Sequence, residues 1–440
     1  MAMFAEAGSL RYAPDRKPLA SSLHLVDRQM HRSSRHDVMN FRTRHDPPWE
    51  CGAPSFLILL CSILLSACDT SGYTDVSEHP IIERDNSARV FQIYPGDAVA
   101  DDLPESLLAL KRVISDSDPA LVIGTVDGSP ATVFGRIADI ATDGSGDFYV
   151  LDSQYSEVRR FGANGIFKSS FAKGGDGPNE LRNPVALDFI DDDLLVVGTG
   201  RGVKIFERTD STFELFRSVP AGPIPSPEDL CVLGSEIFVR SWRSEDETII
   251  HVLDLEGNLL RSFGSGYQSG GPILRRQLSV GPIACVDDPS TVIAAYDGLP
   301  FVRGYAPDGR VRWITHFSDF IPTLHVASVV VESGVEAVSR RRDVASDRLI
   351  SITPVDMGYA IIQVMGVGPM NPSNGVQSGE KWTTIAISAR DGRGFRLTDV
   401  GQQARALFLT SNGRRLYAAG QNVDGLFPEV IGYDYRGMVP

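Results

Sequence analysis

Aromatic and basic residues gather at one point near the middle of the chain. Trp242 lies between Arg240 and Arg243, and a second basic pair, Arg275-Arg276, follows further along. This combination suits the binding of a carboxylate, a sugar or a peptide, because guanidinium groups donate paired hydrogen bonds and stack on aromatic rings. The alternative interpretation is a packing tryptophan flanked by solvated arginines. We take these five residues as candidates for ligand binding.

Sequence templates for catalysis are absent. The chain contains no GxSxG, no HExxH and no phosphate-cradling loop. The histidines after residue 68 are His79, His251, His316 and His325, and none stands at metal-ligand spacing. These features favour a binding protein over an enzyme.

One long apolar run, Phe56 to Ala67, precedes a cysteine that could carry a lipid. The run is too short to span a membrane, which takes about 20 apolar residues, and it fits the apolar region of a secretory signal. Leu65-Ser66-Ala67-Cys68 looks like a bacterial lipobox, in which the cysteine thiol receives a diacylglyceryl group. We predict export and a lipid anchor at Cys68. The alternative is an ordinary signal peptide beside an incidental cysteine.

The signal also sets the predicted domain boundaries, with Met39 as the favoured start of the protein. The prediction is a non-native upstream extension over 1–38, a signal peptide over 39–67, the lipidated cysteine and a tether over 68–119, and a folded domain over 120–440. We therefore expect a membrane-anchored lipoprotein of the cell envelope, facing the periplasm or the surface. The formal net charge of −14 argues against nucleic acid as a partner.

From Ile137 onward the chain repeats a pattern of short apolar strands joined by tight turns, in which Asp-Gly and Asn-Gly supply positive φ. The third turn of the pattern recurs as Asn164-Gly165, Asp210-Ser211, Glu256-Gly257-Asn258, Asp308-Gly309, Asp391-Gly392 and Tyr435-Arg436-Gly437. This spacing suits four-stranded β-propeller blades of about 40–50 residues, and it predicts six blades. One long interval requires an insertion, and residues 326–347 read as a short polar helix.

The two ends of the repeat region complete each other. The sixth blade, from Ala406 to Tyr435, lacks a fourth strand, while Ala120 to Val126 is an apolar strand without a blade. Placing that strand in the last blade closes the ring and removes an exposed sheet edge. We predict an all-β fold, a six-bladed β-propeller over 120–440 that is closed by its N-terminal strand.

The amino-acid sequence of the first repeats resembles that of known propeller families. YVLDSQYSEVRRF, from Tyr149 to Phe161, resembles the core of an NHL repeat, in which the aspartate, here Asp152, caps the turn or bonds neighbouring backbone. GGDGPNELRNP, from Gly174 to Pro184, resembles six-bladed β-propeller lipoproteins of uncharacterised function from several bacterial phyla. The resemblance covers roughly Ala120 to Pro440 and is strongest in the first two blades. It implies the fold and says little about function.

A metal-dependent enzyme is the alternative function. The chain is similar in predicted architecture to calcium-dependent lactonases and NHL-type lyases, whose metal sits in the central channel on ligands from the first strands. Here those strands supply Asp139, Asp188 and Asp229, which become the candidate metal ligands, with calcium as the possible cofactor. One acid per blade is fewer than such a site needs, so a hydrolase, lactonase or lyase ranks second.

We interpret the remaining cysteines and the acidic runs as residues with a structural role. Cys231 and Cys285 occupy matching positions on the first strands of adjacent blades. A disulfide needs Cα atoms closer than about 7 Å, and blades diverge from the axis, so we expect two small buried residues rather than a bond. Asp191-Asp192-Asp193 and Asp287-Asp288 lack the spacing of a calcium loop and read as turn formers.

The connections between the expected strands fall into a tight set, such as Asp143-Gly144, and a long set. The long connections are Gly174 to Asn183, Pro220 to Pro227, Ser241 to Glu247, Gly264 to Gly281, Gly366 to Glu380 and Gly420 to Glu429. In a four-stranded blade these share one face, the long-loop face, and the tight turns share the other, the tight-turn face. Binding residues concentrate in long loops on a rigid scaffold. We predict a binding or scaffold module that recognises a protein, peptide or glycan through the long-loop face.

Overall fold

The computed structural model describes the part of the chain that holds the predicted repeats. The described residues are 89–93, 103–116, 118–210, 212–222, 224–268, 271–322, 327–330, 336–339, 344–355, 358–370, 379–399, 408–411, 415–421 and 427–434. All of them belong to the second of two units, Asp69–Pro440, the first being Met1–Cys68. The predicted upstream extension, signal peptide and lipid attachment at Cys68 lie outside the described residues. Within the described ranges, no helix has the length and apolar character needed to cross a membrane.

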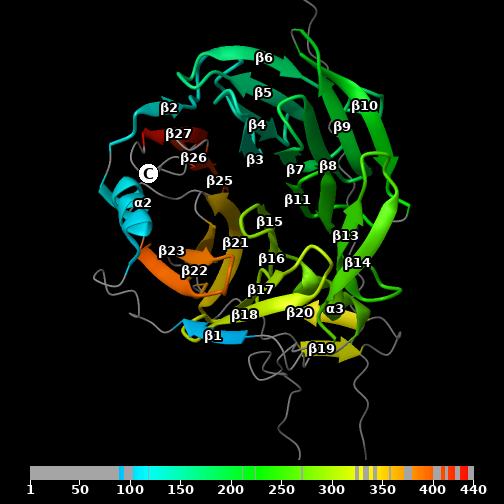
Figure 1. The fold of residues 1–440 in the computed structure, drawn as a ribbon, viewed down its shortest axis with the longest axis vertical. Coiled ribbons are helices and arrows are strands. Elements are labelled where there is room, and N and C mark those ends of the chain that lie inside the picture. Colours follow the sequence, from blue (N-terminus) through cyan, green and yellow to red (C-terminus); the bar gives the residue numbers. More distant parts are fainter. Residues whose placement is uncertain are drawn as a thin grey trace, which may run out of the picture. The chain divides into compact units, whose positions relative to one another are not determined.

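Five blades follow one another along the chain as four-stranded antiparallel sheets, with the first strand of each at the centre of the ring (Figure 1). Blade 1 holds β3 (Ile137–Thr142), β4 (Phe148–Asp152), β5 (Glu157–Phe161) and β6 (Phe167–Phe171). Blade 2 holds β7 (Pro184–Phe189), β8 (Leu194–Thr199), β9 (Gly202–Arg208) and β10 (Phe213–Pro220). Blade 3 holds β11 (Asp229–Leu233), β12 (Glu236–Arg240), β13 (Thr248–Leu253) and β14 (Leu259–Ser265). Blade 4 holds β15 (Ile283–Val286), β16 (Thr291–Ala295), β17 (Phe301–Tyr305) and β18 (Val311–Phe317), and blade 5 holds β21 (Ser346–Val355), β22 (Tyr359–Val367), β23 (Glu380–Ser388) and β24 (Gly394–Asp399).

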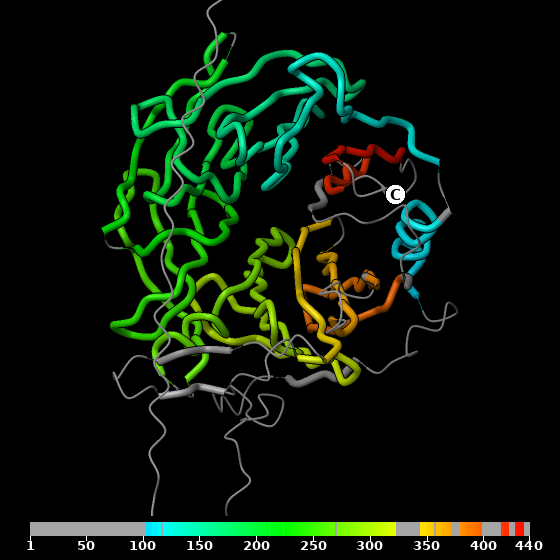
Figure 2. Tube along the Cα trace, turned by 180° about the vertical axis from the view of Figure 1, so that it is seen from behind, coloured from blue at the N-terminus to red at the C-terminus, as the bar shows by residue number. Residues whose placement is uncertain are grey.

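The sixth blade closes the ring as the sequence predicts. Its strands are β25 (Phe408–Ser411), β26 (Arg415–Gln421), β27 (Pro428–Asp434) and β2 (Leu121–Ile123), in the order β2-β27-β26-β25. β2 pairs antiparallel with β27, with Val122 opposite Ile431. Seen from behind, the cyan start of the propeller lies beside its red end (Figure 2). The two ends of the domain therefore share one sheet, and the predicted six-bladed β-propeller is confirmed.

The predicted turn chemistry also appears in the backbone. The third turns of blades 1 and 4 carry Gly165 at φ 80° and Gly309 at φ 92°. These values lie in the left-handed region, where glycine has no Cβ penalty. The turns therefore fix the strand register through residues that the repeat analysis had already marked.

Part of the segment predicted as a tether over 68–119 packs on the propeller. β1 (Arg89–Ile93) pairs in parallel with β18 and adds a fifth strand to the outer edge of blade 4. The helix α2 (Glu105–Asp116) places Leu107, Leu110 and Ile114 against blades 5 and 6. The prediction of a plain tether is therefore corrected for these two elements, because an amphipathic helix buries its apolar stripe wherever a core is open to it.

The insertion between blades 4 and 5 is a hairpin and not the predicted helix over 326–347. β19 (Ala327–Val330) and β20 (Glu336–Ser339) pair antiparallel, with Val329 opposite Ala337. The valine run in this segment is β-branched, which favours strands, and Ser333-Gly334 between the two strands are turn formers. These local preferences outweigh the polar composition on which the helix prediction rested.

The described hydrophobic core lies between blades, in six clusters that each join two neighbouring sheets. Between blades 1 and 2, for example, Tyr149 and Phe213 meet edge to face with ring centroids 5.8 Å apart. Between blades 6 and 1, Phe148 and Tyr417 lie 4.5 Å apart. Stability thus comes from packing of each sheet on the next around the ring, which holds the first strands close to the axis.

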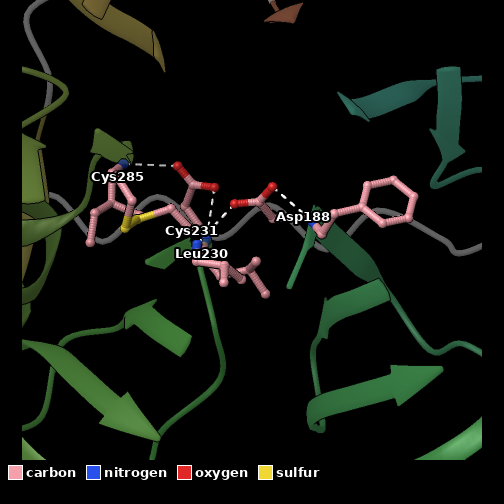
Figure 3. The surroundings of a disulfide bond; sticks show 8 residues. Asp188, Leu230, Cys231 and Cys285 are labelled. Carbon is pink, nitrogen blue, oxygen red and sulfur yellow. Dashed lines mark hydrogen bonds between the residues drawn. A yellow bond between two sulfur atoms is a disulfide. The ribbon is translucent and has the colours of Figure 1, made fainter. Parts of the chain in front are cut away.

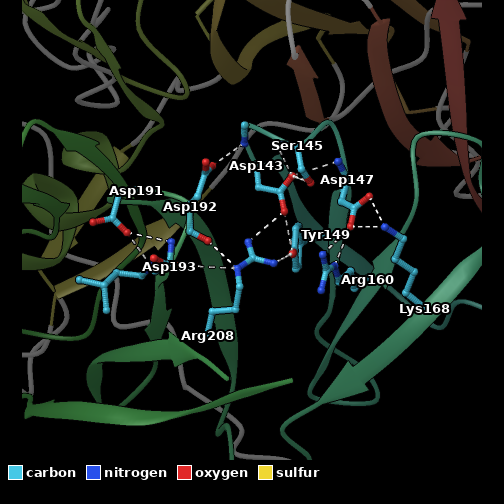
Figure 4. A network of polar contacts seen from close by, with 12 residues as sticks. Asp143, Ser145, Asp147, Tyr149, Arg160, Lys168, Asp191, Asp192, Asp193 and Arg208 are labelled. Atoms are coloured by element: carbon cyan, nitrogen blue, oxygen red, sulfur yellow. Dashed lines mark hydrogen bonds and ion pairs between the residues drawn. The ribbon is translucent and has the colours of Figure 1, made fainter. Parts of the chain in front are cut away.

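A polar network joins blades 1 and 2 at the tight-turn face (Figure 4). Buried Asp143 accepts hydrogen bonds from Ser145 Oγ (2.6 Å), Tyr149 Oη (2.9 Å) and Arg208 Nη2 (2.9 Å). Burial raises the pKa of Asp143, but the hydrogen bonds from these donors lower it by a larger amount. The pKa of Asp143 therefore lies below its ordinary value. The group therefore stays ionised and bonded at neutral pH.

The acidic run in blade 2 takes part in the same network as a turn former. Asp191 Oδ1 accepts the backbone N–H groups of Asp193 (2.9 Å) and Leu194 (2.8 Å), which closes the β7–β8 turn. Asp192 Oδ1 accepts the N–H of Gly144 in blade 1 at 2.6 Å, and a Cβ on Gly144 would lie only 2.7 Å from that oxygen. The turn interpretation of this run is confirmed, and its carboxyl groups are used in hydrogen bonds that hold the turns of blades 1 and 2.

Candidate ligand-binding cavity

The first strands of the blades enclose a cavity of about 790 Å³. Pockets for small ligands typically measure about 300–1,000 Å³. The lining runs along the whole of β3, from Arg136 just before the strand to Thr142 at its end. The polar lining residues are Arg136, Asp139, Thr142, Ser153, Asp188, Glu228, Asp229, Asp297, Arg348, Ser351 and Thr353. A cavity with this mixture of carboxyl, guanidinium and hydroxyl groups is suited to a polar ligand.

The three predicted metal candidates line this cavity and connect neighbouring blades. Each aspartate accepts the next backbone N–H in its own strand through Oδ1 and one N–H of the following blade through Oδ2. The inter-blade bonds run from Leu187 to Asp139 (2.8 Å), from Val232 to Asp188 (2.8 Å) and from Ile283 to Asp229 (2.9 Å). Figure 3 shows two of these links. One is made by Asp188, and the other lies next to it, between the strand of Leu230 and the strand of Cys285. Blades 1 to 4 are thus joined in series at the axis.

Strand register places the three aspartates at different depths. Asp229 is opposite Arg240 at the end of β12, Asp139 is opposite Leu151, and Asp188 is opposite Val196. Because second strands end at the long-loop face, Asp229 lies nearest to that face and Asp188 farthest from it. Among the described residues, no three His, Cys, Asp or Glu side chains are placed to hold a metal ion. Calcium at these positions stays a prediction from the sequence.

Burial raises the pKa of all three carboxyl groups, because the charged form loses water. The pKa of Asp188 rises to about 6 and that of Asp229 to about 7. The pKa of Asp139 also lies well above its ordinary value, through burial and then through the nearby charge of Asp229. Backbone N–H donors lower each value by less than burial raises it. Strongly shifted acids that line a cavity are a mark of functional sites.

Glu228 is a fourth cavity acid, and the sequence analysis did not single it out. It precedes β11, where its backbone N–H donates to the carbonyl of Arg240 at 2.8 Å. Its Oε2 is buried and has no hydrogen-bond partner among the described residues. Burial raises the pKa of Glu228 to about 7, while the charges of Arg240 and Arg276 lower it. The adjacent pair Glu228-Asp229 at the start of a predicted inner strand was the available signal.

The long-loop end of the cavity carries charges of both signs. Arg136 is exposed there and donates from Nε to Ser153 Oγ at 2.7 Å. Across the cavity, Arg348 Nε donates to Asp297 Oδ1 at 2.8 Å. Asp152 accepts the backbone N–H groups of Gly135 (2.8 Å) and Arg136 (3.1 Å), as predicted for the NHL aspartate. The long-loop end of the cavity, its mouth, therefore carries polar groups that are held by hydrogen bonds. The part of the cavity further from this end is richer in acids.

Arg240, the first of the predicted ligand-binding residues, is fully buried. Its Nη2 donates to the backbone carbonyls of Ser279 (2.6 Å) and Ala295 (3.0 Å), and its guanidinium lies 5.0 Å from the ring centroid of Tyr296. Ser279 ends the helix α3 (Pro272–Ser279), where a positive charge is favourable. Arg240 therefore fastens α3 and blade 4 to blade 3 and stands behind the cavity wall.

The other four candidates meet around α3, on the connection between blades 3 and 4. Arg243 pairs with Asp246, and Arg275 pairs with Glu247, so both cations are engaged within the long-loop face. Trp242 packs on the hydrophobic cluster between these blades. Arg276 is exposed, and its charge acts on Glu228. The structure brings the predicted residues together, but they frame the cavity and do not line it.

Cys231 and Cys285 form a disulfide, which corrects the prediction of two unbonded cysteines (Figure 3). Their Cα atoms lie 5.5 Å apart, on β11 and β15. Blades do diverge from the axis, but these residues sit on the innermost strands, where neighbouring blades are closest. The bond therefore joins blades 3 and 4 beside the cavity, two residues further along each strand than the link between Asp229 and Ile283.

Known proteins are similar to this chain only at low sequence identity. No protein-family model matches the chain, and no curated protein matches it. A "putative exported protein" of Bacteroides fragilis is similar at 11% identity and a TM-score of 0.48, over 78% of this chain and 98% of that one. A member of the duf4221 family from Bacteroides vulgatus is similar at 11% identity and a TM-score of 0.46, over 72% of this chain and 96% of that one. PQQ-bound aldose sugar dehydrogenase of Streptomyces coelicolor is similar at 13% identity and a TM-score of 0.37, over 72% and 99%.

Proposed function

We propose that the protein is an exported, lipid-anchored binding module that receives its ligand at the long-loop end of the central cavity. The observation that carries the proposal is the cavity itself, which has Arg136, Ser153 and Asp297 at its long-loop end and is lined there by Glu228, whose buried Oε2 has no hydrogen-bond partner among the described residues. The ligand is a peptide, a segment of a protein or a glycan. The rigid ring supplies the scaffold, and the polar mouth supplies the recognition.

The disulfide supports the exported part of this proposal. Disulfides form and persist in oxidising compartments such as the periplasm and the cell surface, and are rare in the cytosol. Cys231 and Cys285 are bonded to each other. The apolar run before Cys68 supports the route by which the domain would reach such a compartment.

Replacing the predicted lipid attachment residue tests the anchor. In the variant Cys68→Ala the acyl chains are lost, and several such chains are what hold a soluble domain at a membrane. We expect the variant to move from the membrane fraction to the soluble fraction, as measured by immunoblotting after ultracentrifugation. A variant that stays with the membrane would place the anchor elsewhere.

A ligand screen with one variant at each end of the ring tests the binding site. The purified protein is screened by thermal shift against peptides, amines and neutral oligosaccharides. Arg136→Trp narrows the long-loop mouth at an exposed residue, and Asp193→Trp changes a side chain that is 77% exposed on the tight-turn face. We expect a stabilising ligand whose shift disappears in Arg136→Trp and persists in Asp193→Trp. The reverse pattern would contradict the proposed site.

A further inference from the structure

We propose that the group entering the cavity is an organic ammonium, carried by a small amine or by a lysine side chain of a peptide. This inference rests on the proposed function and names the chemistry of its ligand. It starts from Glu228, which lines an acid-rich cavity and whose buried Oε2 accepts no hydrogen bond from the described residues. The missing partner must be a hydrogen-bond donor, because an ionised carboxylate only accepts.

The neighbouring aspartates line the same cavity and have acceptor positions that their backbone donors do not use. Each carboxylate has about four lone-pair sites, and Asp139, Asp188 and Asp229 each use two of them on backbone N–H groups. An ammonium group has three donors. Glu228 together with Asp229, its neighbour in the chain, offers acceptors for such a group at the long-loop end.

Cations of the protein do not neutralise these acids. In the described part of the chain, none of the four carboxyl groups lies within ion-pair distance of a lysine, arginine or histidine. The charges of Arg240 and Arg276 lower the pKa of Glu228, and that of Arg240 lowers the pKa of Asp229, but burial outweighs both effects. Arg348 is bound to Asp297, and Arg240 donates to two carbonyl groups. A buried carboxyl without an ion-pair partner becomes neutral by taking up a proton, and a positively charged ligand can replace that proton, so a cation is the ligand that this cavity favours.

Proton linkage follows from the same arrangement. Burial holds the pKa of Glu228 and Asp229 near 7, so both carry part of a proton at neutral pH, whereas an ammonium with a pKa of about 10.4 stays charged. Binding of the cation favours the carboxylate form and passes protons to the buffer. The charged groups that face this point are Arg136, Asp139, Asp188, Arg240, Arg276, Asp297 and Arg348. Affinity should therefore rise as the pH rises from 5.5 to 8.

Calorimetric titration of the purified protein tests the inference. The probes are cadaverine, a capped Gly-Lys-Gly peptide, the same peptide with an acetylated lysine, a capped Gly-Glu-Gly peptide and maltotriose. Titrations at pH 7 in two buffers of different ionisation enthalpy count the released protons. Glu228→Gln removes the charge without changing the shape, and Glu214→Gln makes the same change at an exposed residue of β10.

We expect the lysine peptide, cadaverine or both to bind with release of protons, and acetylation to abolish binding. Glu228→Gln should weaken binding at least tenfold, and Glu214→Gln should leave it unchanged. Binding of cadaverine without binding of the lysine peptide would identify a free amine as the ligand. Binding of the lysine peptide without binding of cadaverine would identify a protein-borne lysine. If Glu228→Gln does not fold, the pH dependence of the original protein decides.

Binding that ignores acetylation, pH or the Glu228 substitution would overturn the ammonium inference. Binding of maltotriose or the acidic peptide at the long-loop end, in place of the amines, would also overturn it but leave the proposed function standing. If every probe and every panel ligand acts only at the tight-turn face, the proposed function fails as well. The two failures are thereby distinguished.

Discussion

At the scale of single residues, each of the three aspartates that line the cavity joins two neighbouring blades through its carboxyl group. Asp139, Asp188 and Asp229 all accept a backbone N–H of their own strand and one of the next blade. The same groups are held in a cavity where burial disfavours their charge. At the axis, the carboxyl groups that join the blades are therefore also groups whose charge changes with pH.

The cavity carboxyl groups should contribute a fall in the free energy of unfolding as the pH rises from about 4 to about 7, against the opposite contribution of acids with lowered pKa values such as Asp143. In the unfolded chain these carboxyls titrate near 4, whereas burial raises the pKa of Asp188 to about 6 and that of Glu228 and Asp229 to about 7. Between those values the folded state binds more protons than the unfolded state, so stability declines with pH and levels off above about 7. Urea unfolding at constant ionic strength measures the decline.

Glu228→Gln should make this decline smaller, because one of the titrating groups is removed. Buried His251 and half-buried His316 have lowered pKa values, which act in the opposite direction below about 6.5, but they are common to both proteins and cancel in the difference. An identical pH profile in the original and the substituted protein would contradict the assigned pKa of Glu228.

Residue types alone could not identify Glu228 as a site residue. Its importance comes from an unpaired atom, and pairing depends on loops far away in the chain. The predicted cluster around Trp242 lies next to α3, on the connection between blades 3 and 4. Its arginines, however, found partners in Asp246, Glu247 and the end of α3, which the sequence could not reveal.

At the scale of elements, the disulfide and α2 each fasten a junction between blades. The Cys231–Cys285 bond joins β11 to β15, and α2 covers the junction of blades 5 and 6. Both elements escaped the sequence prediction for a geometric reason. The repeat pattern gives the order of strands, whereas the distance between inner strands and the place where a flanking helix packs are properties of the assembled ring.

Removing the disulfide should lower the free energy of unfolding by about 2–4 kcal/mol. The double variant Cys231→Ser/Cys285→Ser frees a loop with a sequence separation of 54 residues, which increases the entropy of the unfolded chain. Urea unfolding of the oxidised protein and the variant measures the difference. Thiol titration under denaturing conditions is the control, and two reactive thiols in the original protein would contradict the bond.

Shortening one buried leucine of α2 should show that the helix belongs to the propeller core. Leu107 is 0% exposed, and Leu107→Ala should cost about 2–5 kcal/mol. Leu108, half-buried on the next position, provides the matched control and should cost less. Equal and small effects of the two substitutions, measured by urea unfolding, would place the helix outside the cooperative core.

The missed helix did carry a signal in the sequence. Leu103, Leu107, Leu110 and Ile114 recur at helical spacing and form one buried stripe. The segment over 326–347 carried the opposite signal, because its valine run favours strands, and the observed hairpin follows that preference. Local propensity was informative in both places once weighed against overall polarity.

At the scale of the whole molecule, the ring is closed by pairing of its two ends. β2 completes the sheet of β27, so no blade is left with three strands at the seam. This feature was predictable because it requires only a repeat count and two incomplete ends. The cavity was not predictable, since its lining combines residues from inner strands of several blades that lie far apart in the sequence.

Removing the closing strand should destabilise the seam. The chain of residues 69–440 keeps β2, and the same chain without Leu121–Ile123 lacks it, while both keep α2. The second chain exposes the edge of β27, and open sheet edges promote association between molecules. Size-exclusion chromatography should show the longer chain as a monomer and the shorter one as aggregate. A monomeric, equally stable shorter chain would contradict closure by β2.

Carboxyl footprinting tests the ligand site at the long-loop end most directly. The protein is treated with a water-soluble carbodiimide and a labelled amine, with and without the ligand that stabilises it in the thermal screen, and labelled residues are identified by mass spectrometry. We predict that the ligand protects Glu228 and Asp229, while exposed Glu214 is labelled equally in both samples. Protection confined to the tight-turn face, for example at Asp193, would contradict the assignment of the long-loop end of the cavity as the binding site.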